Sequence, residues 1–293
     1  MTRLKPNKLL VIFTIISLLG FSFILVKPSI DSINVNANSK VLATKTYIVV
    51  NSDSSTPLPS NFRVNKSLNI SGSGQFTPDQ LSNIKKNINH PQIHVIDLTQ
   101  DSHGFINDTA ISFYSPDICL NKGFSTSEIL STEATLLATI PHSKRITLYN
   151  TTTRPLMDVV VNSVKTEATV THENALQYSR FPVASNSLPS PELVDQFVGY
   201  VKYQSHNSHL YFHCKSGGIN TTTFMTMYQI LNSTKDKSLE DIINYQISIG
   251  GVNIMNHPSH GNFINEFYNY VKSNKSNNFR VPYSKWISET KTR

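Results

Sequence analysis

The chain has 293 residues, of which 39% are hydrophobic, enough apolar sequence to bury the core of one large domain. The formal net charge is +7, but the basic residues are spread along the chain, without Lys or Arg runs and without interleaved aromatic residues. This distribution argues against a nucleic-acid partner, and a solvated basic surface is the simpler interpretation.

The first 37 residues have the pattern of an export signal. Three basic residues, Arg3, Lys5 and Lys8, precede an apolar run over 9–26, and small residues at 35–37 come before a candidate cleavage point after Ala37. The run is about 18 residues long, at the lower limit for spanning a bilayer. We expect a cleaved secretory signal peptide, with an uncleaved membrane anchor as the alternative. Either one predicts an exported protein, and only the anchor implies contact with a membrane.

After this segment, residues 38–59 are polar and are predicted to form a linker or arm, followed by one domain over 60–293. Helices are predicted from capping patterns and apolar periodicity, and strands from short apolar runs. In chain order the predicted elements are a helix starting at 77–80, a strand at 93–98, a helix over 125–140, a helix opening at 190–192, a strand ending at 212, and helices around 239–247 and 263–271. Strands that alternate with helices predict an α/β fold, with helices packed on a central sheet.

The most informative stretch is HCKSGGINTTT at 213–223, which follows the apolar run 210–212. A strand, a tight turn and a helix N-terminus together direct several backbone N–H groups at one spot, where an anion can bind. A thiol in such a place, here Cys214, is a candidate nucleophile. The predicted phosphate-binding loop therefore consists of Cys214 with His213, Lys215, Ser216, Gly217, Gly218, Ile219 and Thr221.

This loop resembles that of the cysteine-dependent phosphatases, which read His-Cys, five residues, Arg, then Ser or Thr. Further segments resemble the bacterial phytase-like family of that superfamily, the protein-tyrosine-phosphatase-like inositol polyphosphatases. The resemblance runs from about residue 58 to the end, and implies a phosphatase-type central twisted sheet flanked by helices. It also implies a small partial β-barrel layer, for which the β-rich segments 46–50 and 147–161 are candidates. The segments that carry it are 61–63, 71–76, 97–107, 178–189, 249–251 and 267–268.

The same alignment argues against phosphatase activity. The family's phosphate-binding Arg is Asn220 here, its general-acid Asp is Ser185, and the Arg that it uses toward substrate phosphates is Thr99. Loss of a general acid costs about 10²–10⁴ in rate, and loss of one transition-state donor about 10²–10³. The alignment also predicts that Thr99, Asp101, His103 and Asn186 line the pocket.

Several residues of the loop have a simpler interpretation beside the functional one. The family has Gly where this chain has Ile219, so Gly218 is the candidate for the turn that needs a positive φ. A buried His213 hydrogen-bonded to backbone is the simpler expectation where catalytic partners are missing. Lys215 is a candidate replacement for the lost positive charge, and a solvated lysine is the commoner outcome. Thr221, Thr222 and Thr223 are expected to cap and start the helix.

The sequence favours two free thiols over a Cys119–Cys214 bridge, with Cys119 as a small buried residue. Asp101 and His103 form one weak metal-binding pair without a third ligand at suitable spacing, so neither a metal nor a cofactor is expected.

Three interpretations remain open. The first is an exported pseudophosphatase that binds a phosphorylated small molecule or another anionic ligand through the loop. The second is a weak cysteine-dependent phosphomonoesterase, acting on inositol polyphosphate or phosphotyrosine, with Lys215 or Glu192 as an improvised partner. The third is a structural or interaction protein with a vestigial pocket. The sequence favours the first, and leaves the ligand and the oligomeric state open.

Overall fold

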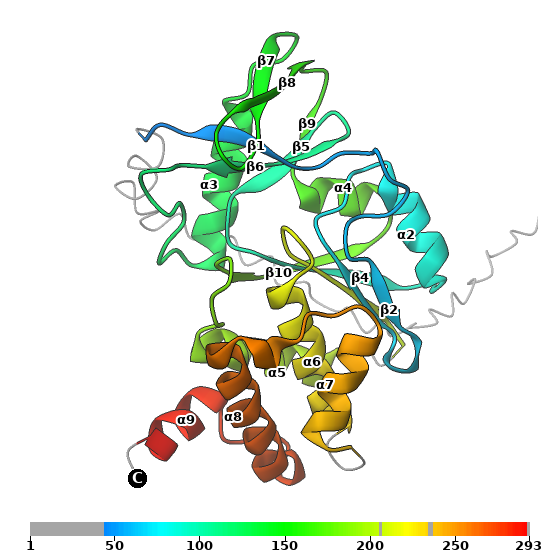
Figure 1. Ribbon diagram of the computed structural model, residues 1–293, viewed down its shortest axis with the longest axis vertical. Coiled ribbons are helices and arrows are strands. Elements are labelled where there is room, and N and C mark those ends of the chain that lie inside the picture. The colour runs from blue at the N-terminus through cyan, green and yellow to red at the C-terminus, as the bar shows by residue number, and fades with distance from the viewer. Residues whose placement is uncertain (1–43, 205–206, 234–236, 292–293) are drawn as a thin grey trace, which may run out of the picture. The chain divides into compact units, whose positions relative to one another are not determined.

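The computed structural model describes residues 44–204, 207–233 and 237–291 (Figure 1). The predicted export signal or anchor over 1–37 lies outside the described residues. Within the described part of the chain, none of the helices is both long and apolar enough to cross a membrane.

A five-stranded sheet, sheet B, leads into the cysteine loop at the end of β11. Its strands run in the order β10-β4-β11-β3-β2, and all neighbours are parallel except the edge strand β2. The central strands β4 and β11 are buried along their whole length, which explains the continuous apolar runs in the sequence. The strands are β2 (Arg63–Asn65), β3 (Ile70–Ser73), β4 (Ile93–Thr99), β10 (Gln177–Val183) and β11 (His209–His213).

One face of sheet B is covered by the helices from α5 onward, which Figure 1 shows gathered below the sheet. Ile96 and Leu98 of β4 and Phe212 of β11 pack there against Phe197 of α5 and Phe224 of α6. These helices are α5 (Pro191–Tyr203), α6 (Ile219–Ser233), α7 (Leu239–Ser248), α8 (Pro258–Asn274) and α9 (Tyr283–Lys291), with short 3-10 helices at Lys66–Leu68, Ile254–Asn256 and Lys275–Asn277.

The other face of sheet B meets α2, α4 and a second sheet, sheet A. Because side chains alternate along a strand, Val95 and Tyr211 face this side, where they pack with Leu81 of α2, Val170 of α4 and Phe105 of sheet A. Helix α2 spans Gln80–Ile88, α3 spans Thr126–Ala138 and α4 spans Glu167–Glu173.

Sheet A has six strands in the order β8-β7-β1-β6-β5-β9, and α3 packs against it through Leu136 and Leu137. It unites the two segments that the sequence marks as β-rich. Strand β1 lies inside the stretch expected to be a linker, but it pairs antiparallel with β6 over Tyr47–Ser52. The linker interpretation is therefore wrong for these residues. The strands are β1 (Tyr47–Ser52), β5 (His103–Ile106), β6 (Thr109–Tyr114), β7 (Arg145–Tyr149), β8 (Pro155–Val160) and β9 (Val164–Lys165).

The predicted starts of α3 and α5 are confirmed by their caps, whereas α2 begins only at Gln80 and its N-cap Asp79 makes no side-chain cap hydrogen bond. Ser125 and Glu128 make both bonds of a capping box at α3, and Ser190 accepts the N–H of Leu193 at α5. The parallel strands then place three polar ends at one edge of sheet B. Strand β4 ends at Thr99, β10 ends at Val183 just before Ser185, and β11 ends at His213 just before Cys214. The α/β fold with helices around a central sheet is confirmed.

The contact between β3 and α6 predicts opposite effects for two Gly→Ala substitutions. A Cβ on Gly72 of β3 would lie 2.5 Å from Met225 Sδ and 2.6 Å from Thr221 Cγ2, whereas a Cβ on Gly199 of α5 meets no atom within 4 Å. We expect Gly72→Ala to lower the free energy of unfolding by about 1–3 kcal/mol through overpacking. Gly199→Ala should raise it by about 0.5–1 kcal/mol by favouring the helix. Urea denaturation of both variants checks this, and equal effects would contradict the described packing.

Candidate functional site

The cysteine loop joins the end of β11 to the start of α6. Gly217 has a φ of 70°, and a Cβ at this residue would lie 2.3 Å from Gly74 N, so both the turn and the close approach require glycine. The expectation that Gly218 makes this turn is therefore wrong. Ile219 is the first residue of α6 and adopts ordinary helical geometry, so it does not strain the loop.

The segments on both sides of β3 support the loop by donating hydrogen bonds to the loop's backbone carbonyls. Asn61 Nδ2 donates to Ser216 O at 2.8 Å, the N–H of Gln75 donates to Lys215 O at 3.3 Å, and Arg63 donates to Gly217 O at 2.9 Å. Arg63 is only 4% exposed, and burial lowers its pKa to about 10 although the nearby Cys214 opposes this. This arginine appeared in the sequence only as part of a family segment; its role as a loop support became visible only in the fold.

Cys214 is a free, buried thiol, and Thr221 Oγ1 donates to its Sγ at 3.1 Å. Thr222 and Thr223 lie inside α6 and donate back to the carbonyls of Gly218 and Ile219. The expectation that these threonines cap the helix is wrong, because the helix begins two residues before Thr221. Cys119 is also free, but it is exposed rather than buried as expected.

Asn220, at the position of the family's arginine, contacts the Ser185 loop. Its Nδ2 donates to Ala184 O at 3.1 Å and lies 3.4 Å from Val183 O, and its Oδ1 is buried without a hydrogen-bond partner. The amide therefore holds the loop in which the family carries its general acid. It supplies no charge to the cysteine loop.

A small cavity of about 30 Å³ lies over the cysteine, which we call the loop cavity. Lys215 is its only charged lining residue among the described residues. Burial lowers the pKa of Lys215, and Asp101 opposes this shift; burial also raises the pKa of Asp101. The cavity is lined by Leu98, Thr99, Gln100, Val183, Ser185, Asn186, Cys214, Lys215, Ser216, Ile219 and Asn220.

The fold thus brings most of the predicted site together. The loop cavity is lined by Cys214 together with Thr99, Ser185, Asn186 and Asn220. Asp101 lines a second, larger hollow that shares Ser185 and Lys215 with the loop cavity. The prediction that His103 lines the pocket is wrong, because this residue is fully buried behind the loop. Glu192, considered as an improvised catalytic partner, lies in the first turn of α5 and lines none of these hollows.

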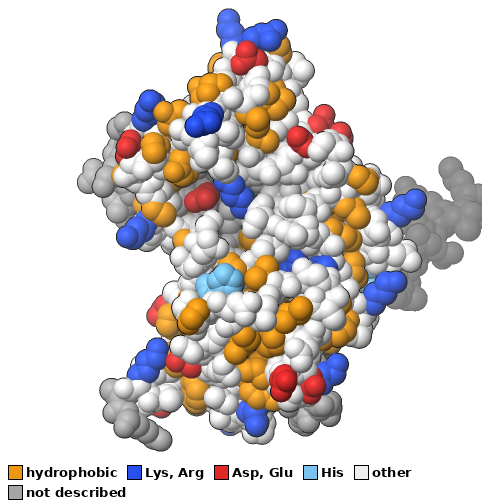
Figure 2. Space-filling model, viewed as in Figure 1, with side chains coloured by type: hydrophobic (Ala, Val, Ile, Leu, Met, Phe, Trp, Pro, Cys, Tyr) orange, Lys and Arg blue, Asp and Glu red, His pale blue; other side chains and the backbone are white. Residues whose placement is uncertain are grey.

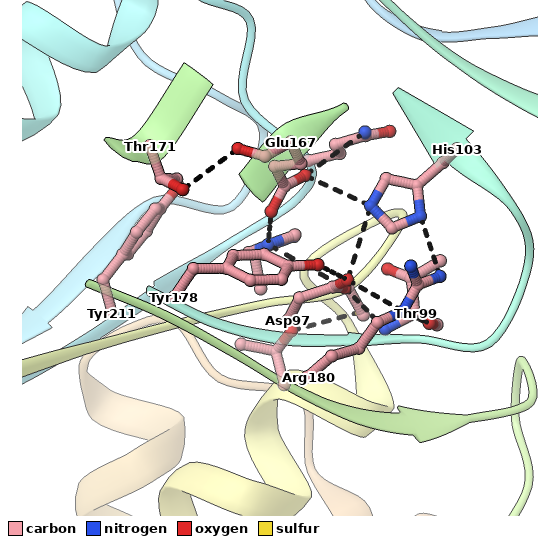
Figure 3. Close-up of polar contacts among 12 residues, drawn as sticks. Asp97, Thr99, His103, Glu167, Thr171, Tyr178, Arg180 and Tyr211 are labelled. Atoms are coloured by element: carbon pink, nitrogen blue, oxygen red, sulfur yellow. Dashed lines mark hydrogen bonds and ion pairs between the residues drawn. The ribbon is translucent and has the colours of Figure 1, made fainter. Parts of the chain in front are cut away.

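Behind the loop lies a buried group of charged residues, the buried ion network (Figure 3). His213 Nε2 lies 2.6 Å from Glu167 Oε1, so this histidine contacts a carboxylate rather than backbone as expected. His103 Nε2 lies between Asp97 Oδ2 at 3.4 Å and Glu167 Oε2 at 3.3 Å. The network consists of Asp97, His103, Glu133, Glu167, Tyr178, Arg180 and His213.

The network joins the two sheets. Asp97, Arg180 and His213 project from sheet B on the face toward sheet A, while His103 comes from β5 and Glu133 from α3. Arg180 lies 3.1 Å from Asp97 Oδ2 and 2.7 Å from Glu133 Oε2. Glu133 and Glu167 were missed from the sequence, because each is a single acidic residue at an ordinary helical position and carries no motif.

Neighbouring charges favour the ionised forms of three buried groups, His103, Glu167 and Arg180. Burial by itself lowers the pKa of His103, but the carboxylates of Asp97 and Glu133 raise it to about 10. Burial opposes ionisation of Glu167, yet the neighbouring His213 and a hydrogen bond from His103 hold its pKa below the usual range. Likewise, Glu133 and Asp97 outweigh burial and raise the pKa of Arg180.

Asp97, Glu167 and His213 place one ligand atom each within 4.8 Å of one another, a spacing that a metal ion also uses. Both oxygens of Asp97 are already engaged, however: Oδ1 accepts the N–H of Thr99 at 2.8 Å, and Oδ2 accepts the Tyr178 hydroxyl at 2.7 Å. The guanidinium of Arg180 beside the same carboxylate would also repel a cation. The donor set therefore fits a network of ion pairs better than a metal site.

Two acidic residues at opposite ends of α4 allow a matched test of the network. Glu167 is fully buried against two histidines, whereas Glu173 pairs with Lys165 at 2.7 Å on the surface, where both are more than 40% exposed. We expect Glu167→Gln to lower the free energy of unfolding by about 3–5 kcal/mol, because it leaves buried partners without a counter-charge. Glu173→Gln should change it by less than about 1 kcal/mol. Urea denaturation at pH 7 measures both, and a small effect of Glu167→Gln would refute the network's structural role.

The raised pKa of His103 predicts a pH dependence. The pKa is about 10 in the fold against 6.5 for an unperturbed histidine, so this histidine stabilises the fold fully below pH 6.5 and progressively less as the pH rises toward 10. We expect stability to fall over this range by up to about 1.4 kcal/mol per pH unit. His103→Gln should abolish this slope, and the variant of an exposed histidine, His172→Gln, should retain it. Denaturation midpoints measured across the range would contradict the assignment if both variants kept the slope.

Comparison with known proteins identifies a family model, a curated relative and solved structures that are similar to this chain. Residues 96–232 match the model of the PTP-like phytase family, whose description names inositol hexakisphosphate. A curated relative, the effector protein hopD2 of Pseudomonas syringae pv. tomato, is 24% identical over 218 residues. The alignment covers 68% of this chain and 47% of hopD2, so the chain spans about half the length of that relative.

Two solved structures share the fold. A PTP-like phytase from Bdellovibrio bacteriovorus is 28% identical with a TM-score of 0.71, over 83% of this chain and 95% of that one. A PTP-like myo-inositol phosphatase from Mitsuokella multacida, solved with myo-inositol-(1,3,4,5)-tetrakisphosphate, is 24% identical with a TM-score of 0.76, over 83% of this chain and 49% of that one. The resemblance of this chain to the PTP-like phytases is therefore confirmed, in the sequence of residues 96–232 and in the fold.

Proposed function

We propose that this chain is an exported pseudophosphatase that binds an anionic phosphoryl group at its cysteine loop without hydrolysing it. The observation that carries the proposal is the position of Asn220, whose amide donates to the carbonyl of Ala184. A neutral side chain engaged in this way cannot act as the fixed bidentate cation of a phosphoryl-transfer site.

The electrostatics of the loop cavity support the loss of hydrolysis. Lys215 is the only cation among its described lining residues, and burial disfavours the charged form of that lysine. Stabilising the charge that develops on a transferring phosphoryl group needs donors and cations already in place. One lysine whose charged form is disfavoured by burial is a weak substitute for the two arginines that the family carries at the positions of Asn220 and Thr99.

The acid side of the reaction is also missing. Ser185 lines the loop cavity at the general-acid position, and no carboxylate is found among the cavity's described lining residues. A serine hydroxyl does not deliver a proton near neutral pH as a carboxylic acid does. Without that proton the leaving alcohol departs as an alkoxide, which keeps the barrier high.

Features needed for binding alone are retained. The loop still leads into the N-terminus of α6, a 15-residue helix whose free N–H groups favour an anion. Asn61, Arg63 and Gln75 donate hydrogen bonds to carbonyls of the loop and so help to fix its shape. The similar structure from Mitsuokella multacida was solved with an inositol tetrakisphosphate, which supports an anionic, phosphorylated ligand without indicating which one. Export remains a proposal that rests on the sequence of residues 1–37.

The proposal predicts which substitutions restore chemistry. In the full-length protein we expect no Cys214-dependent release of phosphate from p-nitrophenyl phosphate or myo-inositol hexakisphosphate. The double variant Asn220→Arg/Ser185→Asp returns the cation and the acid, and should raise turnover of the aryl phosphate by about 10² or more. Phosphate release over time measures both, with Cys214→Ser in each background as the control.

Wild-type turnover that disappears in Cys214→Ser would overturn the pseudophosphatase proposal and favour a weak phosphatase. Binding is tested separately, because a ligand that binds only the folded state raises the melting temperature. Inorganic phosphate should therefore raise the melting temperature of the wild type. If it does not, the interpretation of a structural or interaction protein with a vestigial pocket is favoured.

A further inference from the structure

Strand β8, at one edge of sheet A, carries a group of exposed apolar side chains. Leu156 is 54% exposed, Met157 is 40% exposed and Val160 is 43% exposed. Among the described residues, no other helix or strand carries more than one large hydrophobic side chain exposed to this degree. Exposed apolar side chains that are grouped on one element, rather than scattered singly, mark an interaction surface.

Three cations flank this apolar group. Arg154 comes directly before β8, Arg145 of β7 lies opposite the last residue of β8, and Lys144 precedes Arg145, so positive charge lies at both ends of the strand. All three residues are exposed, and none forms an ion pair with a described residue. The carboxylate on the strand, Asp158, accepts a hydrogen bond from Thr147 Oγ1 at 2.7 Å. We call β8 with its three cations the docking edge. Figure 2 shows hydrophobic and basic side chains together at the upper end of the molecule, where Figure 1 places β7 and β8.

The backbone of the docking edge is poorly suited to pairing with a further strand. The register between β7 and β8 leaves Leu156 without a partner residue, so this residue forms a bulge. Pro155, directly before it, has no N–H to donate. At the other end of the strand, Val160 O already accepts a hydrogen bond from Asn107 Nδ2 at 2.9 Å. Bulges and prolines protect an edge strand from strand addition, so the docking edge binds its partner through side chains.

Apolar side chains between two groups of cations match the chemistry of an anionic lipid surface. The six residues of β8 span about 20 Å. When the strand lies flat on a bilayer, its apolar side chains enter the boundary between headgroups and acyl chains, while the cations at its ends reach the phosphates of the headgroups. A protein partner would need an apolar groove with carboxylates at matching positions, whereas an anionic bilayer offers both features without a matched shape.

We propose that the docking edge binds the headgroup region of an anionic lipid bilayer, with Leu156, Met157 and Val160 in its apolar boundary. The docking edge shares no residue with the lining of the loop cavity. Membrane binding at this edge is therefore a second property of the chain, separate from the proposed anion binding at the cysteine loop.

A fluorescent label on β8 of the full-length protein tests the proposal. Leu156→Cys is labelled with nitrobenzoxadiazole, whose emission moves to shorter wavelength in an apolar environment, in a Cys119→Ser/Cys214→Ser background. Such a label reports contact of β8 itself, even where residues 1–37 bind the vesicle. We expect a blue shift on vesicles of equal parts phosphatidylcholine and phosphatidylglycerol, and little change on phosphatidylcholine alone. A label at Val160→Cys, near the other end of the strand, should shift in the same way.

Tyr203→Cys, labelled in the same background, is the matched control. Tyr203 is 85% exposed on α5, and the ammonium of Lys202 lies 5.4 Å from its ring centre, so an exposed apolar residue with a neighbouring cation lies there outside the docking edge. Its label should not shift. Lys144→Gln/Arg145→Gln/Arg154→Gln, combined with the Leu156 label, should need about 10² times more anionic lipid for half of the shift, since each cation near an anionic surface contributes roughly fivefold.

Four outcomes would overturn the proposal. If the Leu156 label shifts no more than the Tyr203 label, β8 does not contact the bilayer. Equal shifts on neutral and anionic vesicles, or a shift that survives removal of the three cations, would contradict an anionic partner. A shift that appears without vesicles as the protein is concentrated would show that the docking edge binds a second copy of this chain. The proposed anion binding at the cysteine loop would stand in every case, because its readout is the melting temperature in phosphate.

Discussion

The buried ion network between the two sheets is the interaction on which the site depends. Asp97, Arg180 and His213 extend from three neighbouring strands of sheet B and meet His103 of sheet A, so the network ties one sheet to the other directly behind Cys214. Charges buried to this degree are tolerated only when every one has a partner. The position of the cysteine loop relative to sheet A therefore depends on Glu133 and Glu167 as much as on the loop itself.

The contacts that shape the cysteine loop are separate from the residues that would carry its chemistry. Gly217 packs closely against Gly74, Arg63 donates to the carbonyl of Gly217, and Thr221 donates to the thiol of Cys214. These contacts are made by backbone and buried side chains, and they do not require a reacting phosphate. Asn220, by contrast, bonds to the chain beside it. Stability and catalysis place separate demands on the same few residues, and the proposed function requires only the first set.

The charge at the loop cavity comes from a single side chain. Lys215 is the one charged residue among the described residues that line the cavity, and burial lowers its pKa. Fold similarity to inositol phosphatases therefore says little about ligand choice. The ligand is set by the side chains that line the cavity rather than by the fold.

The sequence by itself determined the α/β architecture, the helix caps and the loop at 213–221, because these depend on local periodicity, capping side chains and a contiguous motif. It also located Thr99, Ser185 and Asn220, through the resemblance of their segments to the phytase-like family. Only the tertiary structure decided where side chains without a motif go. It placed Glu133 and Glu167 against the histidines, turned Asn220 toward Ala184, exposed Cys119, and paired β1 with β6 inside an expected linker. The physical reason is that these contacts join residues far apart in the chain, whose burial and pairing are set by packing rather than by neighbouring sequence.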